Sequence, residues 1–132
     1  MSIESWQPQQ AAPSLNKETL NIYIELGDAE NVLQNCINLS EDIVDNLQTL
    51  KTNSMDFWTP LLSDLMAEDI HNLIRFFVVV EEHQSSFFAG NDSPVIAFNK
   101  VLKKRKEPLS KEFLLWIKNN TSNQFIPNGS IF

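Results

Sequence analysis

Hydrophobic side chains recur along much of the chain at the spacing of an α-helix. The longest regular pattern runs from Ala29 to Leu50, where apolar positions alternate at intervals of four and three residues. Asp28 stands directly before it as a candidate N-cap. The pattern therefore predicts one helix of about seven turns that ends near Lys51.

The segment before this pattern is ambiguous. Every second residue from Leu20 to Leu26 is apolar, as in a half-buried strand, while Leu20, Tyr23 and Ile24 also fit helical spacing. A lone strand would have few partners in this chain, so we favour a short helix that Gly27 closes. A short β element at 20–26 is the alternative.

Thr59-Pro60 is a good helix start, because proline at the first helical position gives up only an N–H that has no helical partner. From there the pattern predicts one helix, or two with a kink near Ala67, to about Gln84. Residues Phe76 to Val80 are all apolar, which is typical of a central, buried element. The three valines within them leave a strand as the alternative.

Ser93-Pro94 opens a further helix, which Pro108 ends, and Ser110 caps a last, very apolar helix. With 42% hydrophobic residues and only three glycines, the 132-residue chain favours helices over a sandwich or barrel. We therefore expect a mainly α fold: a single compact bundle of four to six helices with extended arms at both ends. The expected divisions are an arm over 1–13, a helical domain over 14–120 and a tail over 121–132 that docks on the domain or on a partner.

The sequence offers no sign of a cofactor or of a membrane segment. Its three glycines lie more than thirty residues apart, which excludes a glycine-rich phosphate loop. The longest apolar run has five residues, against roughly 20 needed to cross a bilayer. No signal peptide is recognisable and Cys36 is the only cysteine, so we expect a cytoplasmic protein without a cofactor.

The residues that could carry chemistry are few. Cys36 falls on the apolar stripe of the long predicted helix, so we expect a buried thiol rather than a nucleophile. Glu68 and His71 form one Glu-x-x-His motif, but a di-iron bundle needs two, and we expect no metal site. A small helical enzyme or ligand binder, with a pocket around His71, Arg75 and His83, is the third of our hypotheses on function.

Charge is divided unevenly along the chain. Residues 1–69 hold 12 acidic and 2 basic side chains, whereas residues 70–132 hold 5 and 8. Such asymmetry steers a partner of opposite charge or orients two copies of the chain. Glu41, Asp42 and Asp45 are the acidic candidates for binding a basic partner.

A basic cluster follows in the second half, and it underlies the second hypothesis, a nucleic-acid-associated regulator. A pI of about 4.7 and the absence of interleaved aromatic residues make nucleic acid an unfavoured partner. The simpler interpretation is a solvated helix end that complements the helix dipole. The cluster consists of Lys100, Lys103, Lys104, Arg105 and Lys106.

Large aromatic residues in polar surroundings complete the set of candidates. They either complete the core or insert into a partner. Together with the charge asymmetry they favour our first hypothesis, a non-enzymatic protein–protein interaction module such as a small acidic adaptor, regulator or inhibitor. Its partner would be another protein, basic in character, or a second copy of the chain. The aromatic candidates are Trp6, Phe87, Phe88, Phe125 and Phe132.

Overall fold

The computed structural model describes residues 15–84 and 90–127, which form α-helices and no strand. The mainly α character is confirmed, but these residues contain seven α-helices instead of the four to six expected. A short 3-10 turn, η3 (Gly90–Asp92), precedes α6. The helices are α1 (Lys17–Leu26), α2 (Val32–Ile37), α3 (Glu41–Gln48), α4 (Met55–Leu62), α5 (Ala67–His83), α6 (Pro94–Lys104) and α7 (Lys111–Asn120).

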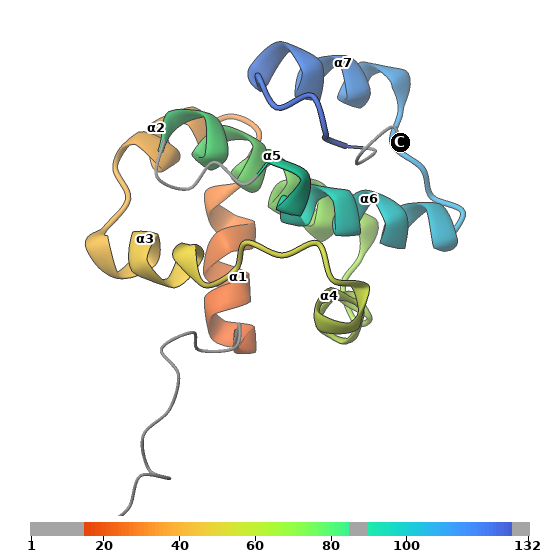
Figure 1. The fold of residues 1–132 in the computed structure, drawn as a ribbon, viewed down its shortest axis with the longest axis horizontal. Helices are drawn as coiled ribbons and strands as arrows, with labels where there is room; N and C mark the ends of the chain where they lie inside the picture. Colours follow the sequence, from red (N-terminus) through yellow and green to blue (C-terminus); the bar gives the residue numbers. More distant parts are fainter. Residues whose placement is uncertain (1–14, 85–89, 128–132) are drawn as a thin grey trace, which may run out of the picture.

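The longest helix, α5, organises the fold. Helices α1, α2, α6 and α7 all pack against it, and α4 packs against α6. In Figure 1, α1, α2 and α3 lie on the left of the molecule and α4 and α6 on the right. Because α5 contacts both groups, it joins the two sides into one hydrophobic core.

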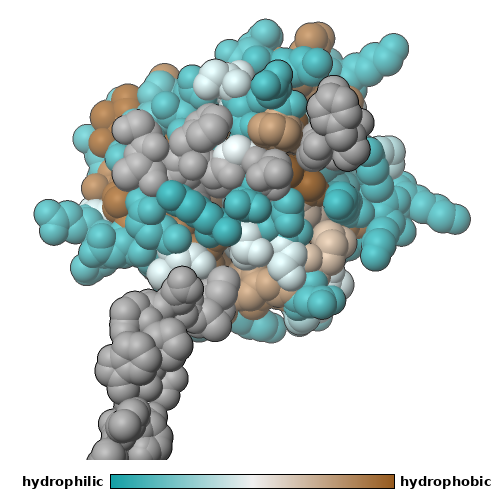
Figure 2. Space-filling view, viewed as in Figure 1, coloured by the Kyte–Doolittle hydropathy of each residue, from teal (hydrophilic) through white to brown (hydrophobic). Residues whose placement is uncertain are grey.

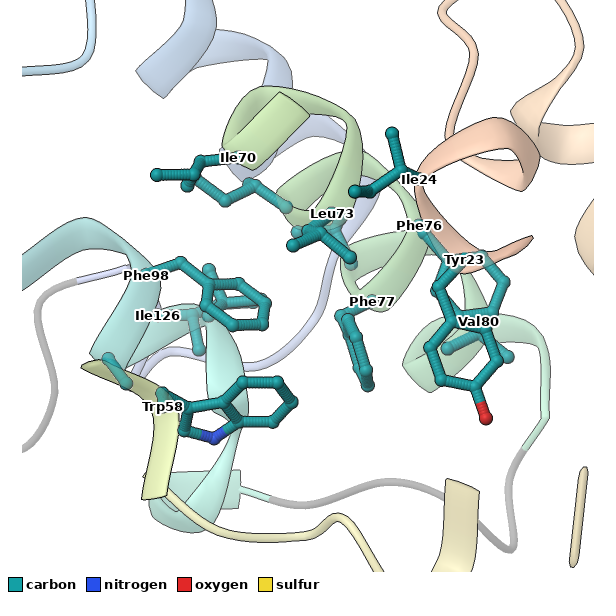
Figure 3. Close-up of a cluster of buried hydrophobic side chains, with 14 of the residues drawn as sticks. Tyr23, Ile24, Trp58, Ile70, Leu73, Phe76, Phe77, Val80, Phe98 and Ile126 are labelled. Atoms are coloured by element: carbon teal, nitrogen blue, oxygen red, sulfur yellow. The ribbon is translucent and has the colours of Figure 1, made fainter. Parts of the chain in front are cut away.

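Aromatic side chains from four helices form the centre of that core (Figure 3). The ring of Trp58 lies 4.8 Å from that of Phe98, and the ring of Phe98 lies 5.5 Å from that of Phe77, both pairs edge to face. On the other side, Tyr23 stacks on Phe76 at 5.1 Å. Such pairs add about 0.5–1.5 kcal/mol each to the free energy of burial. The buried central element expected at 76–80 is confirmed, and it is helical.

The single long helix predicted from Asp28 to Lys51 is wrong. The chain leaves the helix after Ile37 and begins α3 at Glu41. Ser40 adopts an extended backbone, and its hydroxyl accepts a hydrogen bond from the Ile43 N–H at 3.3 Å, which makes it a new N-cap. The apolar stripe continues across this break because both short helices turn an apolar face to the core.

The short helix that we favoured over 20–26 is confirmed, and the strand alternative fails. This segment belongs to α1, which Asn16 caps by accepting from the Thr19 N–H and which Gly27 closes. Pro60 does not begin a helix but lies inside α4, which Ser54 caps. The alternative of two helices with a break near Ala67 is confirmed, since α5 begins at that residue.

Side chains from distant helices satisfy the carbonyl groups at the ends of α4 and α1. The Arg105 guanidinium donates to the carbonyl of Leu62, the last residue of α4, at 2.5 Å and to that of Leu65, three residues further on, at 2.7 Å. Asn72 donates to the carbonyl of Ile24 at 3.0 Å. Helix ends leave such carbonyls without helical partners, so these bonds fix where α1 and α4 end.

The end of α6 is closed by its own backbone. The Glu107 N–H donates to the Leu102 carbonyl at 2.9 Å, and the Lys106 N–H donates to the Lys103 carbonyl at 3.0 Å. These two bonds form a Schellman motif. Lys106, the donor of the second bond, has a φ of 64°, a left-handed conformation that is usual for glycine.

The chain after α7 turns back over α5 and α6. The backbone N–H of Ser122 donates to a Glu82 carboxylate oxygen at 2.8 Å, and the Asn123 side chain donates to the Gly90 carbonyl at 2.9 Å. Asn99, a buried residue of α6, donates to the Pro127 carbonyl at 3.2 Å. Residues 121–127 therefore contribute to the packing of the domain.

Candidate functional site

Helix α3 presents an acidic face. The side chains of Glu41, Asp42 and Asp45 are all exposed. Glu41 and Asp42 lie in the first turn, where their charges stabilise the helix N-terminus. Within residues 15–84 and 90–127, no Lys or Arg forms an ion pair with any of the three. Their negative charges are therefore presented to solvent or to a partner.

The helix that carries this face has few buried residues. Helix α3 buries only Leu47 fully, with Ile43 half-buried against the core. The Tyr23 hydroxyl donates a hydrogen bond to the Asn46 side chain, which ties α3 to α1. No other helix packs closely against α3. The acidic face thus lies at the edge of the molecule.

Exposed apolar side chains lie on the helix directly before the acidic face. Leu33 and Ile37, one turn apart on α2, are 51% and 55% exposed. In Figure 2 hydrophobic surface is visible at the upper left, where α2 lies in the same view of Figure 1. The α2–α3 surface, defined as Leu33, Ile37, Glu41, Asp42 and Asp45, therefore combines apolar contact area with negative charge.

The basic cluster divides into two parts with different roles. Lys100, Lys103, Lys104 and Lys106 are exposed on α6 and just after it. Arg105 is half-buried and binds carbonyls at and beyond the end of α4. The lysines are therefore a candidate phosphate-binding surface, whereas Arg105 holds α4 against α6.

The histidines expected to line a pocket have different surroundings. His83 is exposed at the end of α5. His71 is half-buried, with its ring 5.1 Å from that of Phe113, and burial together with the nearby Arg75 guanidinium lowers its pKa. Of the three expected residues, Arg75 lines the surface groove that lies between α5 and α7.

That groove has a volume of about 320 Å³, at the lower end of the range for small-molecule sites. Its walls come from the turn before α2, from α5 and from α7 with its N-cap. Phe113 and Trp116 belong to the apolar pattern of the last predicted helix, but that pattern did not indicate that they would border a groove. The lining residues are Ala29, Arg75, Ser110, Glu112, Phe113 and Trp116.

Cys36 is buried, as its place in the apolar pattern predicted. It is fully inaccessible, and its thiol donates to the Phe76 carbonyl with a sulfur–oxygen distance of 3.7 Å. Burial raises the pKa of this thiol to about 12. The thiolate needed for nucleophilic attack therefore does not form near neutral pH.

One acidic residue of α5 is buried. Glu81 is 1% exposed, and the Ser93 hydroxyl donates to its carboxylate at 2.5 Å. Ser93 also caps α6 by accepting from the Val95 N–H at 3.2 Å. This pair links the end of α5 to the start of α6. The local Glu-Glu-His sequence gave no signal of it, because burial here comes from tertiary packing.

The aromatic candidates are only partly described. Trp6, Phe87, Phe88 and Phe132 lie outside the described residues. Phe125 is half-buried against the core. Its role in binding a partner stays a prediction.

In the part of the chain that the structure describes, no three His, Cys, Asp or Glu side chains gather as metal ligands. No helix there has the length and apolar character required to span a membrane. Comparison with known proteins finds no match to a family model, to a curated protein or to a solved structure.

Proposed function

We propose that this chain is a non-enzymatic interaction module that binds a basic partner protein through its α2–α3 surface. The observation that carries the proposal is the succession along the chain of Leu33 and Ile37, exposed on α2, and three exposed carboxylates on the next helix. Apolar contact supplies affinity, and the surrounding charge selects a partner of opposite sign.

The charge distribution of the whole molecule supports the same proposal. Residues 15–54, which form α1, α2 and α3 on the left of Figure 1, hold seven acidic and two basic side chains. The excess of basic residues belongs to the second half, which supplies α6 and α7. A basic partner is therefore attracted to the α2–α3 end of the molecule before contact, and this raises its association rate.

The proposal is tested by comparing two variants with the same charge change. The first, Glu41→Gln, Asp42→Asn and Asp45→Asn, removes the carboxylates of α3. The second, Glu18→Gln, Glu25→Gln and Asp56→Asn, removes three exposed carboxylates elsewhere, two of them also in first helical turns. Both variants lose three negative charges, so an effect of net charge alone would be equal in the two.

Each chain is immobilised and exposed to nuclease-treated lysate, and the captured protein is identified and then purified. The wild type and the second variant should bind the purified partner, and the α3 variant should bind it at least tenfold more weakly. Association of the wild type should slow as salt rises from 50 to about 200 mM, because screening shortens the range of attraction. Equal binding by both variants, or an association rate that salt leaves unchanged, would contradict the proposal.

The exposed lysines of α6 favour a second candidate, a nucleic-acid-associated regulator. Lys100, Lys103 and Lys104 are exposed on α6. They lie near the C-terminus of this helix, which is the negative end of its dipole. If they contact phosphates, changing all three to Glu abolishes retention on DNA or RNA, and each lost contact lowers the salt slope by about one unit. A wild-type chain that binds neither nucleic acid at low salt would exclude this candidate.

A further inference from the structure

The groove between α5 and α7 contains a guanidinium group that is only partly used by the fold. The Nε–H of Arg75 donates to the Gly27 carbonyl at 3.0 Å, and an Nη2–H donates to the Asn72 side chain. A guanidinium has five N–H donors. Among the described residues no further acceptor binds Arg75, so three donors remain for a ligand in the groove that it lines.

The charge of Arg75 is incompletely solvated. Burial lowers the pKa of the guanidinium, and the nearby Asp28 carboxylate acts in the opposite direction. A guanidinium that has lost part of its hydration forms stronger hydrogen bonds with an anion than an exposed one does. An anionic group that enters this groove would therefore meet a positive charge that has lost part of its hydration.

Aromatic rings form the neighbouring wall. The Phe113 ring lies under the Arg75 guanidinium, with 5.5 Å between the guanidinium carbon and the ring centre. Trp116, one turn further along α7, meets Phe113 edge to face at 5.9 Å and is half-buried. The groove thus offers an indole surface for a planar ring beside a donor for an anion.

Acidic groups limit the charge of the ligand. Glu112 lines the same groove, and Asp28 lies close enough to Arg75 to act on its charge. These two protein carboxylates repel a doubly charged ligand such as a phosphate monoester. A ligand with a single carboxylate is repelled less. The volume of about 320 Å³ fits a ligand of one or two fused rings.

We propose that this groove binds a small aromatic monocarboxylate, whose carboxylate pairs with Arg75 and whose ring packs on Trp116. This proposal is independent of the α2–α3 surface, since none of the five residues of that surface lines the groove.

The test uses 2-naphthoate and its neutral analogue 2-naphthamide, which share the ring and differ in charge. Binding is followed by NMR through the indole N–H signals of the three tryptophans, Trp6, Trp58 and Trp116. We expect 2-naphthoate to shift the Trp116 signal with a Kd of about 1 mM, typical of a ligand of this size. The signal of the fully buried Trp58 should not move, and it reports that the core is intact.

Three variants measure what Trp116, Glu112 and Arg75 each contribute to naphthoate binding. Trp116→Ala should weaken naphthoate binding roughly threefold to tenfold through the lost ring contact. Because this variant lacks the Trp116 reporter, its binding is measured from the broadening of the NMR signals of naphthoate itself. Glu112→Gln should strengthen it about threefold by removing a like charge. Arg75→Gln should abolish the preference for naphthoate over naphthamide, a ratio that can be measured as long as the Trp58 signal shows a folded core. Equal affinities of the two compounds for the wild type, weaker binding to Glu112→Gln, or shifts at Trp58 instead of Trp116 would each overturn the proposal.

Discussion

Gly27 and Asn72 bring the backbones of α1 and α5 into direct contact. A Cβ atom placed on Gly27 would lie 1.8 Å from the Asn72 carbonyl oxygen, a distance that no side chain can accommodate. Gly27 has a φ of −85°, so the requirement for glycine is one of space and not of backbone conformation. The same junction contains the bonds from Asn72 and Arg75 to carbonyls at the end of α1.

Gly27→Ala is expected to force α1 away from α5 and to lower the free energy of unfolding by about 3 kcal/mol or more. Urea denaturation followed by circular dichroism measures this loss. The control Asn21→Ala, at an exposed position of the same helix, should change stability by less than about 0.5 kcal/mol. A Gly27→Ala protein as stable as this control would mean that the two helices are not in backbone contact.

Lys106→Gly is expected to stabilise the protein by about 0.5–1 kcal/mol, because glycine adopts a φ of 64° without the steric cost that lysine has. The control Lys104→Gly removes the same charge from the last turn of α6 and should instead destabilise by a similar amount. The urea midpoints of the two variants should therefore move in opposite directions, with unchanged slopes. A lower midpoint for both would contradict the left-handed conformation of Lys106.

Cys36 should react with a thiol reagent such as DTNB only when the protein unfolds. Its thiol is inaccessible, and burial raises its pKa to about 12, so almost no thiolate is present at pH 8. We expect no reaction on mixing in buffer and one equivalent of released thionitrobenzoate in 8 M urea. Labelling of the folded protein within seconds would show that α2 leaves the core readily.

His71 should make stability depend on pH below neutrality. Its pKa in the folded state is lowered by burial and by the positive charge of Arg75, while Glu107 and Glu68 act in the opposite sense. The unfolded chain therefore binds this proton more tightly. The stabilising contribution is complete above a pH of about 6.5 and is lost as the pH falls from there through the folded pKa.

The comparison of wild type with His71→Gln isolates this contribution, since other groups titrate equally in both. Between about pH 7.5 and 5 the melting temperature of the wild type should fall more than that of His71→Gln. A difference between the two proteins that is constant over this range would show that His71 titrates alike in the folded and unfolded states.

The sequence predicted local structure best where cap residues and apolar spacing agree. Ser93-Pro94 and Ser110 begin α6 and α7 as expected, because each serine caps its own helix. The long helix failed because the apolar spacing outweighed a second cap signal at Ser40, which is followed by two acidic residues of a first turn. Both signals are local, but only the cap determines where a helix begins.

The candidate sites were less predictable than the helices. The exposure of Glu41, Asp42 and Asp45 followed from the polar side of the predicted pattern, and this much could be read from the sequence. The groove could not, because it joins Arg75 of α5 to Trp116 of α7, forty-one positions apart in the chain, and no local pattern encodes that approach. The burial of Glu81 beside Ser93 was missed for the same reason.

The loose attachment of α3 also determines how the molecule opens. Because α3 buries only Leu47 fully and packs closely against no other helix, we expect its amide hydrogens to exchange with solvent through local opening, whereas those of the central residues of α5 should exchange only when the whole domain unfolds. The proposed partner of the acidic face would therefore meet a helix that opens before the rest of the domain does.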